Sequence, residues 1–502
     1  MPIENIIETI DRFAEKEGNR LVYDSGSEQY TYQQLKEISD NIAYYLTTHV
    51  PCGPIVVYGE QEFEMIATFV ACSKAGRAYI PIEAHTPMER FEMILSVAHP
   101  ALIIDTKNQL KDKKATIDTE MIAYEEIPTC DPIELTPVCG EDTYYIIFTS
   151  GTTGVPKGVQ ISHDNLLSFV NWELNDFNIT QGERFLSQAP YSFDLSVMSV
   201  YPALTSGGCL VPLTKQVFND FKTLFNVLPK MKLDVWVSTP SSMELCLMDQ
   251  SFNGEHLNTL KTFLFCGEEL SVSTAKKLVE RFPNANIYNT YGPTEATVAV
   301  TKVLVTKEMT EHCARLPIGY CKEDTQIIIM DDNKPVAPGE VGEMVIVGPS
   351  VSKGYMNNAE KTAEAFFEYE EMPAYRTGDA GHVDEEGCYF YDGRMDFQVK
   401  FHGYRMELED IDHHLNKVSY IKQAVVVPKY KEHKVQQLIA YAIPNENHFE
   451  KSYELTKAIK EELKGGVMDY MIPQRFVYVD QLPLTPNGKI DRKGLINEVN
   501  HR

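Results

Sequence analysis

Short apolar runs rich in β-branched residues alternate along the chain with longer segments whose apolar positions have helical spacing. The short runs predict buried strands, and they include IVVY at 55–58, YYIIF at 144–148, VWVS at 235–238, FLF at 263–265 and TQIIIM at 325–330. Segments 61–76 and 271–283 have the pattern of helices between such strands, and the second begins with a capping Ser271 and stops at a proline. This alternation predicts an α/β fold, with a large N-terminal domain of sheets covered by helices.

From about residue 320 the pattern changes to a β-rich section punctuated by turn residues. Pro335, Pro338, Gly339 and Gly342 separate short apolar strands such as GEMVIVG. After residue 395 the pattern changes again, to a helical segment, an AVVVP strand and a helix at 453–464. We therefore expect a large domain over 1–395, with a β-rich subdomain over about 320–395, and a small C-terminal α+β domain over 396–502.

Composition and charge restrict the function classes. No apolar run among the 502 residues approaches the roughly 18 residues that a membrane span needs. The acidic N-terminus lacks the pattern of a signal peptide, so we expect a cytoplasmic protein without a membrane span. A net charge of −26 argues against nucleic-acid binding, which needs a basic surface. The ten cysteines contain no C-x-x-C pair and no zinc-ligand spacing, which indicates reduced thiols.

The segment FTSGTTGVPKG at 148–158 has the composition of a phosphate-binding loop. Its glycines allow close approach of the backbone to a ligand, Thr149 and Ser150 offer hydroxyl donors, and Lys157 offers a positive charge. The segment lies between an apolar strand and ISHDNLLSFVNWEL, which predicts a helix capped by Ser162 whose N–H groups help to surround phosphates. The Walker spacing is missing, because no hydroxyl residue follows Lys157 directly. A flexible surface loop is the alternative interpretation.

Three further segments carry side chains suited to a nucleotide. NTYGPTEATVAV at 289–300 combines an aromatic ring, hydroxyls and Glu295, whose carboxylate suits Mg²⁺, although a capped turn would explain the same pattern. Asp379, in YRTGDAG, suits the two hydroxyls of a ribose, and Arg394, in YDGRMDF, suits phosphate or ribose oxygens. Lys489, in PLTPNGKIDR, lies in a Pro/Gly loop where an isolated lysine would normally be solvated.

In this order, and over residues 31–489, these segments resemble the adenylate-forming superfamily, which includes acyl-CoA synthetases and the adenylation domains of peptide synthetases. The resemblance implies a two-step ligase, in which ATP and a carboxylate give an acyl-adenylate and pyrophosphate, and a thiol then takes the acyl group. LSQAPYSFDLSVMSVYPAL at 186–204, WVSTPSSMELCLM at 236–248 and FLFCGEEL at 263–270 look like the members that load D-alanine onto a phosphopantetheinylated carrier protein for teichoic acid modification. The choice of D- over L-alanine rests on this resemblance alone.

The resemblance implies a role for individual residues of this chain. It implies an ATP site made of Thr149, Ser150, Asn289, Thr290, Tyr291, Gly292, Pro293, Thr294, Asp379, Tyr391, Arg394 and Lys489, with Mg²⁺ at Glu295. It implies a substrate site made of Asp194, Cys266, Val298 and Lys489. The Asp194 carboxylate would pair with the substrate α-ammonium, and a buried salt bridge with another side chain is the alternative. Cys266 would line the side-chain pocket, unless it is an ordinary core cysteine.

Lys489 is the expected catalytic residue, because its charge would stabilise the negative charge that builds as the carboxylate attacks phosphorus. No protein base is needed, since a carboxylate is already ionised at neutral pH. The resemblance also implies a mobile C-terminal domain that rotates about a hinge at Asp396 and exchanges Lys489 for a thiol tunnel shaped by Gly403.

Other function classes stay open on the sequence alone. One is a free-standing adenylation enzyme for another small amino acid, or a short-chain acyl-CoA synthetase. Another is a nucleotide-binding regulator without turnover, against which the presence of Lys489, Glu295 and Asp379 argues. A P-loop kinase is disfavoured because the Walker spacing is missing.

Overall fold

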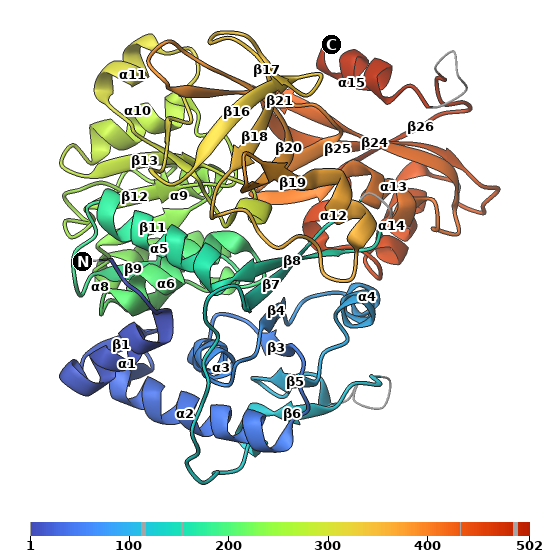
Figure 1. The fold of residues 1–502 in the computed structure, drawn as a ribbon. Coiled ribbons are helices and arrows are strands. Elements are labelled where there is room, and N and C mark those ends of the chain that lie inside the picture. The colour runs from blue at the N-terminus through green and yellow to red at the C-terminus, as the bar shows by residue number, and fades with distance from the viewer. Residues whose placement is uncertain (1, 112–116, 152–153, 432, 485–489, 502) are drawn as a thin grey trace. The chain divides into compact units, whose positions relative to one another are not determined.

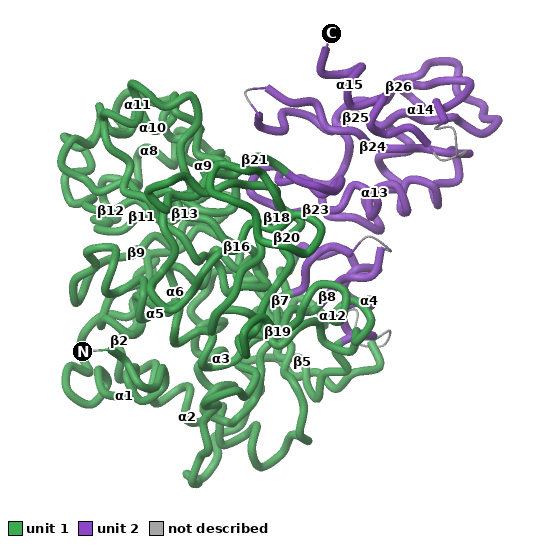
Figure 2. The backbone as a smooth tube through the Cα atoms, turned by 45° about the horizontal axis from the view of Figure 1, so that its top comes forward, with its two compact units in different colours: residues 1–84, 98–147, 158–393 green, residues 85–97, 148–157, 394–502 purple. Residues whose placement is uncertain are grey.

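The computed structural model describes residues 2–111, 117–151, 154–431, 433–484 and 490–501. The chain forms two compact units (Figure 2). Unit 1 comprises residues 1–84, 98–147 and 158–393, and unit 2 comprises residues 85–97, 148–157 and 394–502. Unit 2 thus starts close to the expected boundary and also takes in two segments from earlier in the chain. The domain extents 1–395 and 396–502 stay a prediction.

Unit 1 contains a nine-stranded sheet in the order β15-β14-β13-β12-β11-β9-β10-β1-β2 (Figure 1). Strands β9 to β13 pair in parallel, as does β1 with β10, whereas β2, β14 and β15 are antiparallel to their neighbours. The central strands β11 and β12 are buried at every position, as expected for parallel strands covered on both faces. The strands are β1 Leu21–Asp24, β2 Gln29–Thr31, β9 Arg184–Ser187, β10 Cys209–Pro212, β11 Val235–Ser238, β12 Thr262–Phe265, β13 Asn286–Tyr291, β14 Thr301–Leu304 and β15 Tyr320–Cys321.

A six-stranded sheet has the order β6-β5-β3-β4-β7-β8. Strand β3 pairs in parallel with β4 and β5, and β4 pairs in parallel with β7, where Tyr79 lies opposite Tyr145. Its apolar runs are those that the sequence predicts as strands at 55–58 and 144–148. The strands are β3 Ile55–Gly59, β4 Tyr79–Glu83, β5 Leu102–Asp105, β6 Met121–Ala123, β7 Thr143–Thr149 and β8 Lys157–Ser162.

The glycine-rich segment is followed by a strand instead of a helix, which corrects the sequence interpretation. In strand β8, Val159 and Ile161 are buried and Gln160 between them is partly exposed. Helix α5 (His163–Asp176) begins only after this strand. Ser162 does cap α5, as predicted, but it forms a closed capping box with Asn165. The N-terminus of α5 is therefore separated in sequence from the glycines, and its first N–H groups already have partners.

Helices accompany the strands of unit 1 in the alternation that the sequence predicts. Ser271 caps α10, which ends just before Pro283, so both predicted ends of that helix are confirmed. The helices are α1 Ile6–Glu17, α2 Tyr32–His49, α3 Phe63–Lys74, α5, α6 Val197–Thr205, α7 Lys215–Asn219, α8 Phe221–Met231, α9 Pro240–Cys246, α10 Val272–Arg281, α11 Lys307–His312 and α12 Ala359–Ala365. Short 3₁₀ turns are η2 Tyr124–Glu126, η3 Asp194–Ser196 and η4 Thr294–Ala296.

The β-rich section of unit 1 is an antiparallel sheet in the order β17-β16-β18-β20-β19, with β21 paired to β20. The strands are β16 Gln326–Asp331, β17 Lys334–Pro335, β18 Gly342–Val347, β19 Phe366–Tyr369, β20 Met372–Val383 and β21 Tyr389–Arg394. This sheet lies in the part of the chain that the turn-rich pattern marks as β-rich. The α/β fold class with a β-rich section and a smaller C-terminal part is confirmed.

Unit 2 has its own hydrophobic core, formed by α13, α14 and the apolar face of a three-stranded sheet, β24-β25-β26. A separate hairpin, β22–β23, precedes α13. The elements are α4 Met88–Ala98, β22 Gln398–Phe401, β23 Tyr404–Glu407, α13 Leu408–Leu415, β24 Ile421–Lys431, β25 Lys434–Pro444, α14 Ser452–Leu463, η5 Asp469–Met471, β26 Arg475–Tyr478 and α15 Arg492–Asn500. Among the described residues of both units, no helix is long and apolar enough to span a membrane.

A charge network holds the first three helices of unit 1 together. The Lys74 ammonium on α3 is almost fully buried and pairs with Asp11 on α1, at 2.8 Å between Nζ and Oδ1, and with Asp40 on α2. Lys36, which is more exposed, binds the second carboxylate oxygens of Asp11 and Asp40 at 3.1 and 2.9 Å. The buried lysine therefore neutralises carboxylates from two different helices.

We predict that Lys74→Met lowers the free energy of unfolding by about 2–4 kcal/mol, because two largely buried carboxylates lose a buried counter-charge. Lys36→Met is the matched control and should cost less than about 1 kcal/mol, since its ammonium is partly solvated. Urea unfolding followed by tryptophan fluorescence measures both. Equal losses in the two variants would contradict the special role of the buried lysine.

Candidate functional site

Predicted substrate and nucleotide residues of unit 1 lie at the carboxyl ends of strands in the nine-stranded sheet. Asp194 lies in the connection after β9, Cys266 directly follows β12, and segment 291–295 begins with the last residue of β13. These three strands are parallel members of one sheet, so their carboxyl ends meet at one edge. Ligands of open α/β sheets bind outside that edge. The structure thus brings together residues that are far apart in the sequence.

Asp194 is a buried carboxylate held by a neutral donor. Its exposed fraction is 7 %, and the Thr294 hydroxyl donates a hydrogen bond to its Oδ2 at 2.7 Å. Thr294 is 100 residues away in the sequence. A hydroxyl donor stabilises the ionised carboxylate without bringing an opposite charge of its own.

Asp379 is held by the phenol of Tyr291. The Tyr291 hydroxyl donates to Asp379 Oδ2 at 2.6 Å, and both residues are buried. Burial, reinforced by the Asp379 charge, raises the pKa of Tyr291 well above its usual value, so the hydroxyl stays protonated and remains a donor. The backbone N–H of Asp379 donates to the Thr377 hydroxyl at 3.0 Å. The Tyr391 ring lies 6.1 Å from the Tyr291 ring, centroid to centroid.

Glu295 is fully buried in η4, and the Tyr355 hydroxyl donates to its Oε1 at 2.8 Å. In the part of the chain that the structure describes, no three His, Cys, Asp or Glu residues cluster as a complete metal site. That donor set does not conflict with Mg²⁺ at a nucleotide, because this ion commonly takes one or two carboxylates and fills its other positions with phosphate oxygens and water. Glu295 fits such a single protein ligand.

Cys266 and Val298 lie side by side, as a shared pocket wall requires. The Cys266 thiol is 3.6 Å from the Val298 carbonyl oxygen, to which it donates. Thr297 and Val298 have φ angles of 56° and 70°, which β-branched residues rarely adopt. A Cβ on Gly292 would lie 2.8 Å from the same carbonyl oxygen and 2.5 Å from Ala299 Cα, so this position accepts only glycine without a backbone shift.

The remaining predicted nucleotide residues of segment 289–294 are also buried. Asn289 donates through Nδ2 to the Pro317 carbonyl at 2.8 Å, and the Thr290 hydroxyl donates to the Phe265 carbonyl at 2.8 Å. These two side chains hold β13 against its surroundings. Because these side chains are bonded within the protein, a contact with the nucleotide would involve their backbone. The role of Asn289 and Thr290 in nucleotide binding stays a prediction.

In unit 2, the predicted phosphate-binding hydroxyl of Ser150 is bound to strand β23. It donates to the Arg405 carbonyl at 3.3 Å and accepts from the Glu407 N–H at 3.2 Å. The Lys157 ammonium lies 3.9 Å from Glu407 Oε1, and Thr149 donates weakly to the Lys157 carbonyl at 3.5 Å. Burial raises the pKa of Glu407, although Arg405 and Lys157 act in the opposite direction. In this conformation the loop's polar groups contact β23.

Arg394 and Asp396 form a two-armed ion pair at the start of unit 2. Arg394 Nε lies 2.9 Å from Asp396 Oδ1, which also accepts from the Gln398 N–H at 3.0 Å. Burial acts to raise the pKa of Asp396, but the hydrogen bonds and charge of Arg394 outweigh it and lower the pKa. The expected ligand role of Arg394 and the expected hinge role of Asp396 stay predictions. Lys489 lies outside the described residues.

Four residues that contact predicted site residues were missed by the sequence interpretation. Tyr355 and Glu407 have no local signal, because each acts on a partner at least 60 residues away. Thr377 does have one, since it is the hydroxyl residue two positions before Asp379 in a glycine turn, where short polar side chains bind the local backbone. Arg315 lies 5.2 Å from the Tyr391 ring centroid and also belongs to the surroundings of the site.

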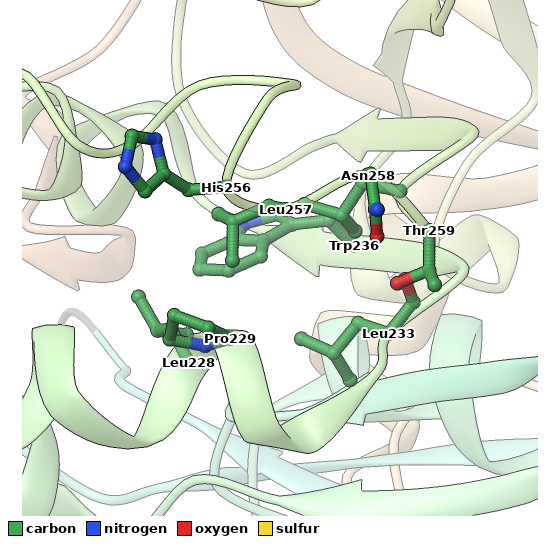
Figure 3. Close-up of a pocket in the computed structure, with 9 residues that line it drawn as sticks. Leu228, Pro229, Leu233, Trp236, His256, Leu257, Asn258 and Thr259 are labelled. Atoms are coloured by element: carbon green, nitrogen blue, oxygen red, sulfur yellow. The ribbon is translucent and has the colours of Figure 1, made fainter.

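A separate small pocket lies elsewhere in unit 1 (Figure 3). It is formed by α8 and the segment before β12, and Figure 3 shows Leu257 beside the Trp236 ring, with Leu228 and Pro229 across the space. Six of its nine lining residues are apolar, and none of the nine is predicted for the site. We therefore place the candidate site at segment 291–295 instead.

Comparison with known proteins adds the family context. A family model described as AMP-binding enzyme matches residues 10–356, and one described as AMP-binding enzyme C-terminal domain matches residues 410–489. A Lacticaseibacillus paracasei protein named D-alanine--D-alanyl carrier protein ligase is 54 % identical over 505 residues, which cover 99 % of this chain and 100 % of that protein. A Streptococcus agalactiae protein of the same name is 52 % identical over 512 residues, with 99 % and 100 % covered.

Solved structures have the same fold. The Vibrio cholerae adenylation domain AlmE, in complex with glycyl-adenosine-5'-phosphate, is 24 % identical, with a TM-score of 0.83 and 99 % of this chain and 97 % of that chain covered. Holo-PA1221, a peptide synthetase protein with adenylation and carrier domains, is 25 % identical, with a TM-score of 0.81 and 98 % and 84 % covered.

We predict that Tyr291→Phe weakens binding of an adenine nucleotide about tenfold, because the Asp379 carboxylate loses a charge-assisted hydrogen bond. Tyr288→Phe is the matched control on the same strand, since its hydroxyl bonds Asn178 and not a site carboxylate. Calorimetric titration with AMP measures both affinities. If both variants bind AMP with the affinity of the unaltered protein, the Tyr291 hydroxyl does not orient Asp379 for the ribose.

Proposed function

The chain belongs to the AMP-binding enzyme family, and from that premise we propose that it activates D-alanine with ATP and transfers the D-alanyl group to the phosphopantetheine thiol of a carrier protein. Two kinds of observation support this. The two relatives described above share more than half of their residues with the chain and are named for that reaction. Asp194 supplies a buried anionic group at the edge of the sheet, which an amino acid needs and a simple fatty acid does not.

The amine of the substrate pairs with Asp194 in this proposal. A buried carboxylate at 7 % exposure needs a cation or several donors, and the α-ammonium supplies both charge and N–H groups. Cys266 and Val298 limit the space beside it, which suits a methyl side chain. The Val298 carbonyl, turned by its positive φ, is a second acceptor for the ammonium. The three groups contact different substituents of the Cα atom, which is what discrimination between enantiomers requires.

The nucleotide uses the other two buried carboxylates, those of Asp379 and Glu295. Asp379 accepts hydrogen bonds from the ribose hydroxyls, with its orientation fixed by Tyr291. Residues Asn289 to Thr294 provide the shelf for adenine and the α-phosphate, and Tyr391 and Arg394 assist at the ribose. Glu295 holds Mg²⁺, which supplies neutralisation of phosphate charge when it is bound. Thr149 and Ser150 bind the triphosphate once Ser150 leaves its contact with β23.

The chemistry needs no protein nucleophile. A carboxylate oxygen of D-alanine forms a bond to the α-phosphorus of ATP, the bond from that phosphorus to the bridging oxygen breaks, and pyrophosphate leaves. Lys489 stabilises the charge that accumulates in this step. In the second step the carrier thiol, as its thiolate, attacks the carbonyl carbon of D-alanyl-adenylate, and AMP leaves with the bonding pair.

The two half-reactions require different placements of the C-terminal part. We propose that the part from Asp396 onward moves between them, so that Lys489 serves adenylation and the β22–β23 hairpin with Gly403 serves thiol transfer. The loaded carrier then provides D-alanine for teichoic acid. We place the enzyme in the cytoplasm, where its co-substrate ATP is found.

The amino-acid choice is tested by pyrophosphate exchange into ATP with D-alanine, L-alanine, glycine and propionate. D-alanine should give the highest kcat/KM, and propionate should fall about 100-fold below it, because it cannot pair with Asp194. In Asp194→Asn the gap between D-alanine and propionate should narrow. A higher kcat/KM for another of the acids would contradict D-alanine as the substrate. If none of the acids supports exchange, a regulator without turnover is favoured.

The domain movement is tested by two variants, each of which should lose mainly one of the two half-reactions. Lys489→Ala should lower pyrophosphate exchange about 10²–10³-fold and spare thioester formation from preformed D-alanyl-adenylate, because the lysine acts on phosphorus. Asp396→Pro should lower thioester formation more than tenfold beyond its effect on exchange, because a fixed φ restricts rotation at that residue. Radiolabelled D-alanine on the carrier measures the second step. If Asp396→Pro lowers the rates of both half-reactions equally, Asp396 is not the hinge.

A further inference from the structure

The guanidinium of Arg315, in the connection between α11 and β15, is bound through two nitrogens to one carboxylate. Its Nε donates to Glu269 Oε1 at 2.8 Å, and its Nη2 lies 2.5 Å from Glu269 Oε2. The two side chains are 25 % and 18 % exposed. Glu269 belongs to the connection after β12, three residues after Cys266. A guanidinium held by both oxygens of a carboxylate has a defined orientation, which a single-point ion pair does not provide.

The segment that carries Arg315 is held by hydrogen bonds to two strands of the site. Asn289 on β13 donates through Nδ2 to the Pro317 carbonyl at 2.8 Å. The backbone of Tyr389, the first residue of β21, exchanges two hydrogen bonds with Gly319, at 2.8 and 3.3 Å. These contacts place the Arg315 segment beside β21.

The Arg315 guanidinium lies over the ring of Tyr391. The distance from its Cζ to the ring centroid is 5.2 Å, which is within the roughly 6 Å over which a cation is attracted to the face of an aromatic ring. Tyr391 follows Tyr389 by two residues in β21, so both side chains point to the same side of that strand. Both also pack against the core cluster that contains Tyr291.

Tyr391 connects Arg315 to the carboxylate predicted to bind the ribose. The Tyr391 and Tyr291 ring centroids are 6.1 Å apart, with an angle of 37° between the ring planes. Aromatic pairs attract each other at this separation. The Tyr291 hydroxyl donates to Asp379 Oδ2 at 2.6 Å. The position of the Tyr391 ring therefore shapes the surface next to Asp379.

We propose that Arg315 is a positioning residue for the nucleotide, whose guanidinium, oriented by Glu269, holds the Tyr391 ring where the ribose binds. The proposal rests on the proposed function, because it assumes that Asp379 and Tyr391 contact the ribose. In this role Arg315 contacts none of the reacting atoms, and its whole effect on the nucleotide passes through the Tyr391 ring.

Arg376 on β20 provides a matched control, because it makes the same kinds of contact elsewhere in unit 1. Its Cζ lies 5.1 Å from the Phe367 ring centroid, and its Nη1 lies 2.9 Å from Glu343 Oε2. Its side chain is 29 % exposed. Arg376→Met and Arg315→Met therefore each remove an ion pair and a cation–ring contact. Only the ring under Arg315 belongs to the predicted nucleotide site.

The first test is calorimetric titration of the unaltered protein, Arg315→Met and Arg376→Met with AMP. Arg315→Met should weaken AMP binding about fivefold, because the Tyr391 ring loses the cation that holds it. In pyrophosphate exchange, KM for ATP should rise by a similar factor, while KM for D-alanine changes less than twofold. Arg376→Met should leave AMP affinity within twofold of that of the unaltered protein. Equal weakening in both variants would indicate a general structural loss and refute the role of Arg315.

A double-mutant cycle tests whether Arg315 acts through the ring. Tyr391→Leu removes the ring, and Arg315→Met is then measured with and without this substitution. In the Tyr391→Leu protein, Arg315→Met should change AMP affinity less than twofold, because the contact that it removes is already lost. If the two losses add in full, Arg315 does not act through Tyr391 and the proposal fails.

The outcomes separate the role of Arg315 from the proposed function. If the unaltered protein binds AMP and exchanges with D-alanine, and Arg315→Met equals it in AMP affinity and in KM for ATP, the role of Arg315 is refuted and the proposed function stands. If the unaltered protein neither binds AMP nor supports exchange, the proposed function fails and the role of Arg315 fails with it. Arg315→Gln replaces Arg315→Met if that variant does not fold.

Discussion

Buried carboxylates need hydrogen-bond donors, and this constraint organises the whole site of unit 1. An ionised carboxylate taken out of water is destabilised by several kcal/mol unless its oxygens find partners. In this site the donors are hydroxyl groups, and each of the three pairs has one member in segment 291–295. The pairs are Tyr291 with Asp379, Thr294 with Asp194, and Tyr355 with Glu295. Each hydroxyl stabilises its carboxylate by donating a hydrogen bond, without bringing an opposite charge.

The same three contacts tie separate parts of unit 1 to one short turn. Asp194 comes from the connection after β9, Asp379 from the β-rich sheet, and Tyr355 from the connection after β18. Because a side chain in a strand reverses its direction with every residue, a shift of β13 by one residue would turn Tyr291 away from Asp379. The register of β13, set by its parallel pairing with β12, therefore determines the geometry of the site.

The sequence predicts the elements better than their contacts. VWVS is a strand with the predicted bounds, and Ser271 and Pro283 mark α10, because these signals are local. Strand β8 is missed, since KGVQIS contains only two apolar residues, Val159 and Ile161, and so short an alternation does not separate a strand from a loop. The sequence motifs identify the individual site residues. The pairing of Thr294 with Asp194 spans 100 residues and depends on strand order, which local periodicity does not reveal.

Hydrogen bonds also hold a strained turn that directly follows segment 291–295. Thr297 and Val298 both have positive φ, which is unfavourable by about 1–3 kcal/mol for each residue. The Thr297 hydroxyl donates to the Ser350 carbonyl at 2.8 Å, and the Val300 N–H donates to the Tyr291 carbonyl at 2.8 Å, so both ends of the strained turn are fixed. In this turn the Val298 carbonyl accepts from the Cys266 thiol. A relaxed turn would carry that acceptor elsewhere, and the wall of the pocket would lose the polar atom nearest to its thiol.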